Sequence, residues 1–345
     1  MKIASFNIQR FGQTKMSDPN ILSILVKVKR AGAGQIVSRY DIIVILEVVD
    51  ISGVSVDCFL RELNRVNQEH HYTLKISSRL GRTRYKEQFL FLYRDDVVDL
   101  VGSYQYEDDQ AGDTDVFARE PYILRFSSDS TVLKDLVLIP VHTKPEDSEK
   151  ELDELYEVFL TVKDKWRTDN IMILGDFNAD GAYISASEMK NIRIRSDKNF
   201  HWLIGDDVDT TAHPGNEHTY DRIVVYGDDM LEAVVPNSAQ PFNFQKALRL
   251  TEAMALQVSD HYPVEVELCS LPSRVRKRSS NLPLQSPWKH TAEGPGNEFP
   301  LTLSCQTEEL YKEVLELKKE NQQLKRTKLK LEISMLEIKL AKQKK

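Results

Sequence analysis

Residues 1–268 contain a series of short apolar runs rich in valine, isoleucine and leucine, each four to six residues long and bounded by polar or turn residues. Runs of this length that are hydrophobic throughout predict buried strands. Longer segments with the apolar spacing of a helix lie between some of them, at 56–66 and 148–168. Strands that alternate with helices predict one large domain in which helices cover sheets. The predicted strands span residues 41–46, 89–93, 136–141, 171–174, 222–226 and 264–268, and the first residues, 2–6, also have a strand-like pattern.

The composition excludes several classes of protein. With 41% hydrophobic and 29% charged residues, the chain is neither collagen-like nor wholly disordered. No apolar run approaches the roughly 18 residues that a membrane-spanning helix needs, so we expect no membrane partner. Three cysteines, Cys58, Cys269 and Cys305, are too few for a disulfide scaffold and lack the spacing of a metal cluster. They fit a reducing compartment.

Charge divides the chain into two regions. Residues 271–345 carry 16 lysines and arginines against nine acids, whereas residues 1–270 carry 30 against 44. The change coincides with a stretch rich in proline, serine, glycine and asparagine, near whose start lies the basic run 274–278. We therefore predict a folded domain at 1–268, a flexible basic linker at 269–306 and a separate element at 307–345. The basic run is typical of a nuclear localisation signal or a DNA-contacting patch, or is an ordinary solvated linker.

A heptad repeat fills the last element. Leucine or isoleucine recurs at every seventh residue, and the alternate core position holds Val314, Asn321, Lys328 and Met335. The pattern predicts a coiled-coil helix, in which polar residues at the alternate position fix register and oligomeric state. We expect a homodimer through residues 307–345, and the alternative is a single solvated helix folded back on the domain. The repeating positions are Leu310, Leu317, Leu324, Leu331 and Ile338.

Acidic, amide and imidazole side chains gather at the ends of the predicted strands. One such residue is ordinary, because Asp and Asn are common in turns. A set at the ends of six strands indicates a site, since loops at strand ends form the crevices in which layered α/β folds bind ligands. The set comprises Asn7, Glu47, His142, Asp176, Asn178, Asp221, Asp260 and His261.

These residue types suit the cleavage of phosphodiesters. Two histidines, His142 and His261, can divide the proton transfers between an attacking water and a leaving oxygen. Each needs a carboxylate to orient it, and Glu87 and Asp221 are available. Hard oxygen ligands favour Mg²⁺ or Ca²⁺ over zinc. The predicted cation ligands are the carboxylates of Glu47, Asp176 and Asp260, with amide oxygens of Asn7 and Asn178.

Six segments of residues 1–268 closely resemble the deoxyribonuclease I family of the endonuclease/exonuclease/phosphatase superfamily. The GDFN and SDHYP motifs are characteristic of the superfamily, and the segments around Tyr85 and Tyr220 narrow the resemblance to the nuclease branch. The segments follow one another in order and are dispersed over the whole domain. They are KIASFNIQRFG (2–12), LGRTRYKEQFLFLYR (80–94), FAREPYILRF (117–126), IMILGDFNAD (171–180), TYDRIVV (219–225) and VSDHYPVEVEL (258–268).

The resemblance implies an α+β fold with four layers, in which two packed and mainly antiparallel sheets are flanked by helices. It also implies a metal-dependent endonuclease that hydrolyses DNA to 5′-phosphorylated ends, with Mg²⁺ or Mn²⁺ as the cofactor and Ca²⁺ as a structural or activating ion. Carried over by position, the resemblance implies that His142 and His261 are the acid–base pair, oriented by Glu87 and Asp221. It implies that the cation and the scissile phosphate are bound by Asn7, Glu47, Asp176, Asn178 and Asp260. It gives Tyr85 and Arg119 as DNA contacts.

The chain departs from the family pattern at several positions. Val49 and Gln9 stand where the family carries arginines that contact DNA, which predicts weaker binding and a flatter sequence preference without loss of chemistry. Gly181 and His218 stand where a stabilising disulfide is expected. With the absence of a secretion signal, this predicts an intracellular enzyme, in the nucleus or cytoplasm. Secretion is the alternative if residues are missing from the N-terminus of this sequence.

Three loops remain ambiguous. Residues 27–34, KVKRAGAG, look like an insertion in the family's first helix, either a loop between two shorter helices or a misplaced splice boundary. Asp209 with Thr211 resembles one of the family's calcium loops, although His213 departs from it. A second calcium loop is suggested by Asp115, Phe117 and Glu120, and ordinary loop acids are the alternative at both places.

Two other functions compete with the nuclease. One lies within the superfamily, namely a phosphatase of lipid or sugar phosphates or an apurinic-site repair nuclease, and the segment around Tyr85 disfavours it. The other is a catalytically weak or nonenzymatic DNA-associated scaffold that acts through the basic coiled coil. In that case the loss of the disulfide and the insertion at 27–34 would have destabilised the nuclease domain.

Overall fold

The computed structural model describes residues 1–26, 35–108 and 115–271, which belong to one compact unit, Met1–Arg276. The predicted coiled coil, nearly all of the predicted linker and the predicted insertion at 27–34 lie outside the described residues. The boundary at Leu268 therefore stays a prediction. In the part of the chain that the structure describes, no helix is both long enough and apolar enough to cross a membrane.

The first sheet has six strands in the order β11-β12-β1-β2-β4-β3. Only β1 and β2 run parallel, with Asn7 opposite Leu46, and the other neighbours are antiparallel. The register between β1 and β2 shifts after Asn7, so the end of β1 bulges away from a regular ladder. The strands are β1 (Lys2–Phe11), β2 (Ile42–Val48), β3 (Tyr72–Ile76), β4 (Gln88–Arg94), β11 (Gln240–Pro241) and β12 (Val264–Glu267).

The second sheet also has six strands, in the order β5-β6-β7-β8-β10-β9. Its one parallel pair is β7 with β8, where His142 lies opposite Asp176. Strand β10 runs antiparallel to β8, and its first residue, Asp221, also pairs with Asp176. The strands are β5 (Asp99–Gln105), β6 (Tyr122–Ser127), β7 (Asp135–His142), β8 (Ile171–Asp176), β9 (Phe200–Trp202) and β10 (Asp221–Tyr226).

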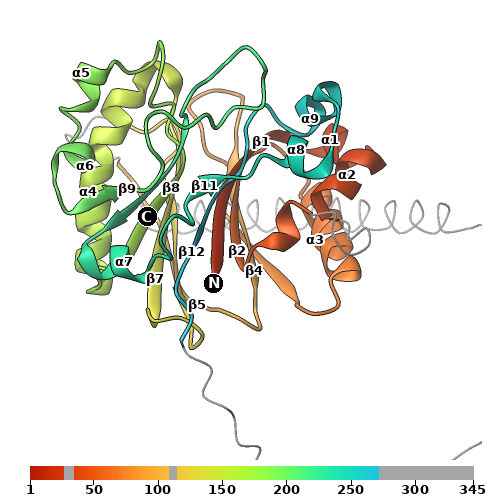
Figure 1. The fold of residues 1–345 in the computed structure, drawn as a ribbon, viewed down its shortest axis with the longest axis horizontal. Coiled ribbons are helices and arrows are strands. Elements are labelled where there is room, and N and C mark those ends of the chain that lie inside the picture. The colour runs from red at the N-terminus through yellow and green to blue at the C-terminus, as the bar shows by residue number, and fades with distance from the viewer. Residues whose placement is uncertain (27–34, 109–114, 272–345) are drawn as a thin grey trace, which may run out of the picture. The chain divides into compact units, whose positions relative to one another are not determined.

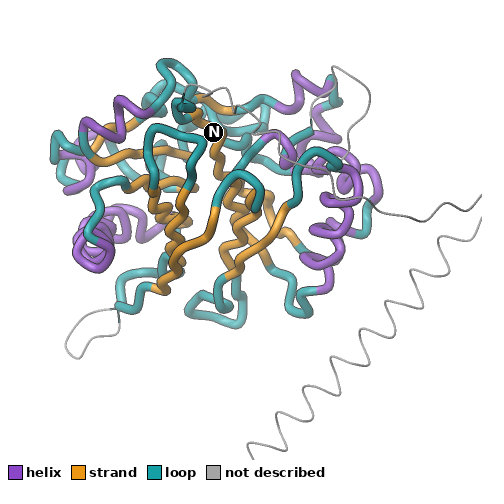
Figure 2. The backbone as a smooth tube through the Cα atoms, turned by 90° about the horizontal axis from the view of Figure 1, so that it is seen from below, coloured by secondary structure: helices purple, strands orange, loops and turns teal. Residues whose placement is uncertain are grey.

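The two sheets pack face to face in the middle of the domain, with helices on the outer face of each (Figures 1 and 2). Beside the first sheet lie α1 (Gln13–Met16), α2 (Pro19–Val26), α3 (Val54–Val66), α8 (Phe244–Leu248) and α9 (Glu252–Val258). Beside the second lie α4 (Ser148–Trp166), α5 (Ala186–Met189) and α6 (Arg193–Ser196). The remaining helix is α7 (Asp228–Ala233), and short 3₁₀ turns occur at Val37–Arg39 and Pro145–Asp147.

Three hydrophobic clusters separate these layers. Alternate residues of β2 serve different clusters: Val44 packs between the sheets, whereas Ile43 and Ile45 pack against the helices beside the first sheet. In the same way Leu138 of β7 faces the other sheet and Ile139 faces α4. Because both faces of these central strands are buried, their sequences are apolar throughout rather than alternating.

The predicted strands and the two predicted helices are all present, with bounds that differ by a few residues. The sheets are mixed, since each contains one parallel pair among otherwise antiparallel strands. The apolar runs did not predict strands β3, β5, β6, β9 and β11. Strand β5 explains why, because it forms an edge of its sheet and alternates exposed with half-buried residues instead of forming an apolar run.

Candidate active site

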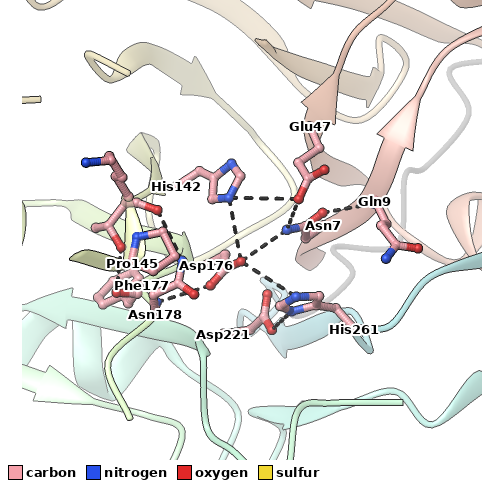
Figure 3. A network of polar contacts seen from close by, with 12 residues as sticks. Asn7, Gln9, Glu47, His142, Pro145, Asp176, Phe177, Asn178, Asp221 and His261 are labelled. Carbon is pink, nitrogen blue, oxygen red and sulfur yellow. Dashed lines mark hydrogen bonds and ion pairs between the residues drawn. The ribbon is translucent and has the colours of Figure 1, made fainter. Parts of the chain in front are cut away.

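The predicted site residues from six strand ends meet in one place, at the edge where the two sheets face each other (Figure 3). Strands β1 and β8 contact each other across the sheets, so residues at their ends are brought together. Asn7 lies in β1, Glu47 near the end of β2, and His142 and Asp176 at the ends of β7 and β8. Asp221 begins β10, and Asp260 and His261 lie in the loop before β12.

The backbone around this site is held in unusual conformations. Seven described residues other than glycine have a positive φ angle, and four of them, Gln9, Arg10, Glu47 and Asn178, belong to or adjoin the site. Left-handed backbone is unfavourable for such residues and persists only when surrounding contacts hold it. Here the backbone N–H of Gln9 donates to Asn7 Oδ1 at 2.9 Å, and that of Arg10 donates to Glu47 Oε2 at 3.1 Å.

The first histidine, His142, is oriented by Glu87. Its Nδ1 lies 2.8 Å from Glu87 Oε2, and both side chains are buried. Arg119 donates from Nε to the same oxygen at 2.7 Å, and its Nη2 lies 3.5 Å from His142 Nε2. Burial alone would raise the pKa of Glu87, but His142 and Arg119 outweigh it and lower that pKa to about 2. Glu87 is therefore an ionised acceptor at neutral pH.

The second histidine, His261, is oriented by Asp221. Its Nδ1 lies 2.7 Å from Asp221 Oδ2, and Asp221 is completely buried. Burial raises the pKa of Asp221, although its contact with His261 opposes the rise. Burial also disfavours the charged form of His261, but carboxylates led by Asp221 and Asp176 outweigh it and raise the pKa of His261. His261 therefore holds a proton readily next to a buried acid.

Asp176 lies between the two histidines. Its Oδ2 is 3.8 Å from His142 Nε2 and 3.7 Å from His261 Nε2. Asn7 Nδ2 donates to this oxygen at 3.1 Å and to Glu47 Oε1 at 3.0 Å. Glu47 Oε1 in turn lies 4.0 Å from His142 Nε2. The Nε2 atoms of both imidazoles thus face one space that two carboxylates border.

The predicted ligands suit a divalent cation. Glu47 and Asp176 share the amide group of Asn7, so two negative charges lie close together with only a neutral donor between them. Asp260 Oδ1 is buried and makes no hydrogen bond. Carboxylates with unsatisfied oxygens are the donors that Mg²⁺ and Ca²⁺ prefer. The residues present therefore fit a cation bound by oxygen ligands.

One group of closely spaced metal-ligating side chains at the site differs from the predicted set of ligands. The donor atoms of Asp176, Asp221 and His261 lie within 4.8 Å of one another, so only Asp176 is shared with the predicted ligands. Asp221 and His261 already bond each other. Asp260 Oδ1 lies 4.0 Å from Nε2 of His261, and Gln9 Nε2 donates to Asp260 Oδ2 at 2.9 Å.

The two predicted DNA contacts, Tyr85 and Arg119, and the predicted phosphate ligand Asn178 occupy three different environments. Tyr85 is 45% exposed and shares a cavity of about 330 Å³ with Arg119. Arg119 is mostly buried and belongs to the His142 group rather than to an outer surface. Asn178 is buried, and its Nδ2 donates to the carbonyl of Thr143 at 3.1 Å. Of the three, Tyr85 alone is well exposed to a bound strand.

In each of the two loops that resemble calcium sites, an aspartate accepts hydrogen bonds from nearby residues of the same loop. Asp115 and Glu120 have carboxylate oxygens within 4.8 Å of Asp108, which the sequence reasoning missed. Asp108 Oδ2 accepts from the backbone N–H groups of Val116 and Phe117, so it also has a local structural role. In the other loop, Asp209 Oδ1 accepts from Thr211 N and Oγ1.

Residues that hold the site in place through hydrogen bonds were not predicted from the sequence. Ser259 Oγ donates to the carbonyl of Asn7 at 2.6 Å and accepts from His261 N at 3.0 Å, which ties β1 to the histidine loop. Thr210 Oγ1 accepts from Asp221 N at 3.2 Å. Ser259 stands beside Asp260 and His261 in the SDHYP motif, so its position could have been noted. Thr210 gave no such signal.

Comparison with known proteins assigns this arrangement to a family. The sequence profile of the Endonuclease/Exonuclease/phosphatase family matches residues 4–261. Human deoxyribonuclease gamma is 46% identical over 271 residues, which cover 78% of this chain and 86% of that protein. Deoxyribonuclease-1 of the rabbit, Oryctolagus cuniculus, is 46% identical over 269 residues, or 78% of this chain and 92% of that protein. The chain belongs to the deoxyribonuclease I family.

Solved structures of more distant proteins share the fold of this deoxyribonuclease I family member. The catalytic domain of human Nocturnin matches with a TM-score of 0.51 and 14% identity, over 79% of this chain and 94% of that one. An endonuclease/exonuclease/phosphatase family protein from Leptotrichia buccalis matches with a TM-score of 0.51 and 17% identity, over 78% and 99%. At such low identity these likenesses show the fold alone.

The departures from the deoxyribonuclease I family pattern have visible structural consequences. A Cβ atom on Gly181 would lie 2.8 Å from the ring of His218, so the two positions expected to hold cysteines are neighbours. His218 instead stacks on Tyr220, with ring centroids 4.9 Å apart. Of the cysteines that lie within the described residues, Cys58 and Cys269 are both free thiols. His218 Nδ1 also lies 3.4 Å from Asp180 Oδ2, so a ring stack and a polar contact hold this side chain.

Proposed function

We propose that this protein is a divalent-metal-dependent endodeoxyribonuclease that hydrolyses phosphodiester bonds of DNA and leaves 5′-phosphorylated ends. The observation that carries the proposal is the pair of imidazoles, each oriented by its own carboxylate. Their Nε2 atoms lie 3.8 Å (His142) and 3.7 Å (His261) from Asp176 Oδ2. Relatives named as deoxyribonucleases, about 45% identical over most of the chain, supply the substrate class.

The two histidines supply both proton transfers. One imidazole accepts a proton from a water molecule as the water oxygen attacks phosphorus. The other imidazole donates a proton to the O3′ atom as the P–O3′ bond breaks. Glu87 and Asp221 set the orientation of the two rings, because each carboxylate accepts a hydrogen bond from Nδ1 of its histidine. Nε2 of each ring is therefore the nitrogen that faces the substrate space. The products are a 3′-hydroxyl and a 5′-phosphate, so atoms and protons balance.

The phosphate needs positive charge beside it, and Arg119 supplies part of that charge from the chain itself. Glu47 and Asp176, with Asp260 nearby, would hold Mg²⁺ or Mn²⁺, which when bound offsets charge on the phosphate oxygens. Arg119 is already fixed by Glu87, so its guanidinium needs no reorganisation when a phosphate approaches His142. Ca²⁺ suits the acidic loop of Asp108, Asp115 and Glu120 as a structural ion.

A nicking assay tests the proposal. Supercoiled plasmid is incubated with the protein, Mg²⁺ and Ca²⁺, with and without a chelator, and the nicked product is then treated with DNA ligase. We expect nicking that the chelator abolishes, and nicks that ligase reseals because their ends carry 5′-phosphate. A folded protein that leaves the plasmid intact would support the scaffold alternative instead.

A matched histidine variant controls for general damage. His71 Nδ1 lies 2.7 Å from Asp95 Oδ2, the same separation as in the His261 pair, but this pair is exposed and lies outside the site. His71→Ala should therefore nick plasmid at the normal rate. Equal losses in His71→Ala and His261→Ala would mean that the assay reports folding rather than chemistry.

We further propose that residues 307–345 join two copies of the chain as a parallel coiled-coil dimer. The heptad of leucines supports the proposal, and Asn321 at an alternate core position favours two strands over three. Two linked domains on one DNA would raise the effective concentration of the second active site. The full chain should thus scatter light as a dimer and make more closely spaced double cuts than a chain ending at Leu271. A monomer with the same cutting pattern would contradict the proposal.

We also propose an intracellular location, in the nucleus or the cytoplasm. The basic run at 274–278 and the missing disulfide support it. Fractionation of cells that express the native transcript, with detection by an antibody to the domain, tests it. Recovery of the protein from the medium would contradict it.

A further inference from the structure

Glu151 is a buried acid with no part in the chemistry described above. It lies in the first turn of α4 and is 1% exposed. Its Oε1 accepts two hydrogen bonds from the backbone, one from Ala118 N at 3.2 Å and one from Lys144 N at 3.2 Å. A carboxylate is rarely buried unless it is paired with partners such as these.

The two backbone groups belong to the segments that carry Arg119 and His142. Ala118 immediately precedes Arg119, and Lys144 follows His142 by two residues. The side chains of Arg119 and His142 both bond Glu87 Oε2, at 2.7 and 2.8 Å. Glu151 Oε1 thus links the backbone segments that carry Arg119 and His142. The side chains of the same two residues meet at Glu87 Oε2.

The same turn of α4 holds the loop after His142 in other ways. Ser148 Oγ lies 3.0 Å from Thr143 Oγ1 and donates to the carbonyl of Lys144 at 3.0 Å. Thr143 Oγ1 also donates to the carbonyl of Phe177 at 2.7 Å. These contacts fix the loop to α4 and to Phe177, the residue after β8. Glu151 extends the link to the segment that carries Arg119.

We propose that Glu151 is a positioning residue, which sets the separation of Arg119 and His142 through the length and acceptor oxygen of its side chain. The proposal rests on the proposed function for its activity readout. It assigns the role to geometry rather than charge, because both partners are neutral amide groups. Burial raises the pKa of Glu151 to about 7, despite the hydrogen bonds from Lys144 and Ala118, which agrees with an acceptor that does not depend on full ionisation.

Two conservative variants separate length from charge. Glu151→Gln keeps the length and the acceptor oxygen but removes the charge. Glu151→Asp keeps the charge but is one methylene shorter, about 1.5 Å, so its oxygen no longer reaches both N–H groups. A displacement of about 1 Å at a reacting group costs up to 10²-fold in rate.

The expected results follow from that difference. On a short fluorescent DNA duplex, we expect kcat of Glu151→Gln within threefold of the native enzyme, and kcat of Glu151→Asp at least tenfold lower with KM changed less than threefold. A Glu151→Asp enzyme with native kcat overturns the proposal, and so does a Glu151→Gln enzyme as impaired as Glu151→Asp.

A second anchor on the same helix provides the control. Asp153 accepts from Arg193 N at 2.9 Å and from Arg193 Nε at 3.0 Å, so it also ties α4 to a neighbouring segment, away from the histidines. Asp153→Ala should lower the midpoint of thermal unfolding and leave kcat within twofold. If Asp153→Ala lowers kcat as much as Glu151→Asp does, the effect is one of general stability and the positioning role is wrong.

Hydrogen exchange tests the link without any activity. In the native protein the amides of Ala118 and Lys144 should exchange slowly, because both are bonded to a buried acceptor. We expect at least tenfold faster exchange at both amides in Glu151→Asp and native rates in Glu151→Gln. Unchanged exchange in Glu151→Asp would overturn the proposed link. If the exchange result holds while the native protein cuts no DNA, the proposed function fails and the link stands.

Discussion

The burial of Glu151 predicts a measurable dependence of stability on pH. Burial raises the pKa of this carboxyl from its usual value of 4.5 to about 7. The folded protein therefore binds a proton at Glu151 more tightly than the unfolded chain does. The corresponding contribution to stability is complete below pH 4.5 and is lost as pH rises through about 7. The Glu151→Gln variant has no such group to ionise, so it should lack this part of the pH dependence.

The magnitude follows from the two pKa values. One pKa unit corresponds to about 1.4 kcal/mol of free energy. At pH 5 the group is protonated in the folded state and largely ionised in the unfolded chain, which costs about 1 kcal/mol by the linkage relation. At pH 8 the same relation gives about 3 kcal/mol. The free energy of unfolding of Glu151→Gln, relative to the native protein, should therefore rise by about 2 to 3 kcal/mol between pH 5 and pH 8.

Urea unfolding at the two pH values measures this change. Both proteins are unfolded in the presence of a chelator, so that bound cations do not contribute, and the free energies are extrapolated linearly to water. Glu149→Gln is the matched control, because Glu149 lies in the same turn of α4 but is exposed. A difference between Glu151→Gln and the native protein that is equal at pH 5 and pH 8 would refute the reasoning, and Glu151 would then not be a buried titrating group.

Three further predictions concern the site. His142→Ala and His261→Ala should each lower kcat at least ~10²-fold with the fold intact by circular dichroism, and the double variant should lose far less than the product of the two, because both groups serve one transition state. Near-native turnover in either would remove that histidine from the mechanism. Glu47→Gln should raise the Mg²⁺ concentration for half-maximal nicking, since it removes a charged oxygen ligand, and an unchanged Mg²⁺ titration would place the cation elsewhere. Val49→Arg should steepen the slope of log affinity against log salt by about 0.9 for each additional phosphate that the arginine neutralises, and an unchanged slope would mean that Val49 does not face DNA.

The central strands could be predicted because their sequences reflect burial on both faces. Val44 packs between the sheets and Ile45 against the helices, so no position in the run tolerates a polar residue. An edge strand carries no such constraint, which is why β5 contains no continuous apolar run. The same reasoning located the site, since a polar residue directly after an apolar run has to lie at a strand end.

Interactions across the fold could not be predicted in this way. Gln9 stood out only as a departure from the family, whereas the structure brings its amide to Asp260, which is 251 residues away in sequence. Glu151 carries no motif, and its role depends on two backbone N–H groups that any sequence supplies. The type of a residue indicates what chemistry its side chain can do. A hydrogen bond from a backbone N–H cannot be predicted in this way, because nearly every residue has that group.

The topology explains why this site needs mixed sheets. The parallel pairs bring the carboxyl ends of β1 and β2, and of β7 and β8, to one edge, where Asn7, Glu47, His142 and Asp176 lie. An antiparallel neighbour at the same edge contributes its amino end instead. Strand β10 therefore supplies its first residue, Asp221, opposite Asp176, and the His261 loop enters just before β12, which runs antiparallel to β1. If β10 ran parallel to β8, its carboxyl end would lie at this edge, and Asp221 would lie at the far end of the strand from His261.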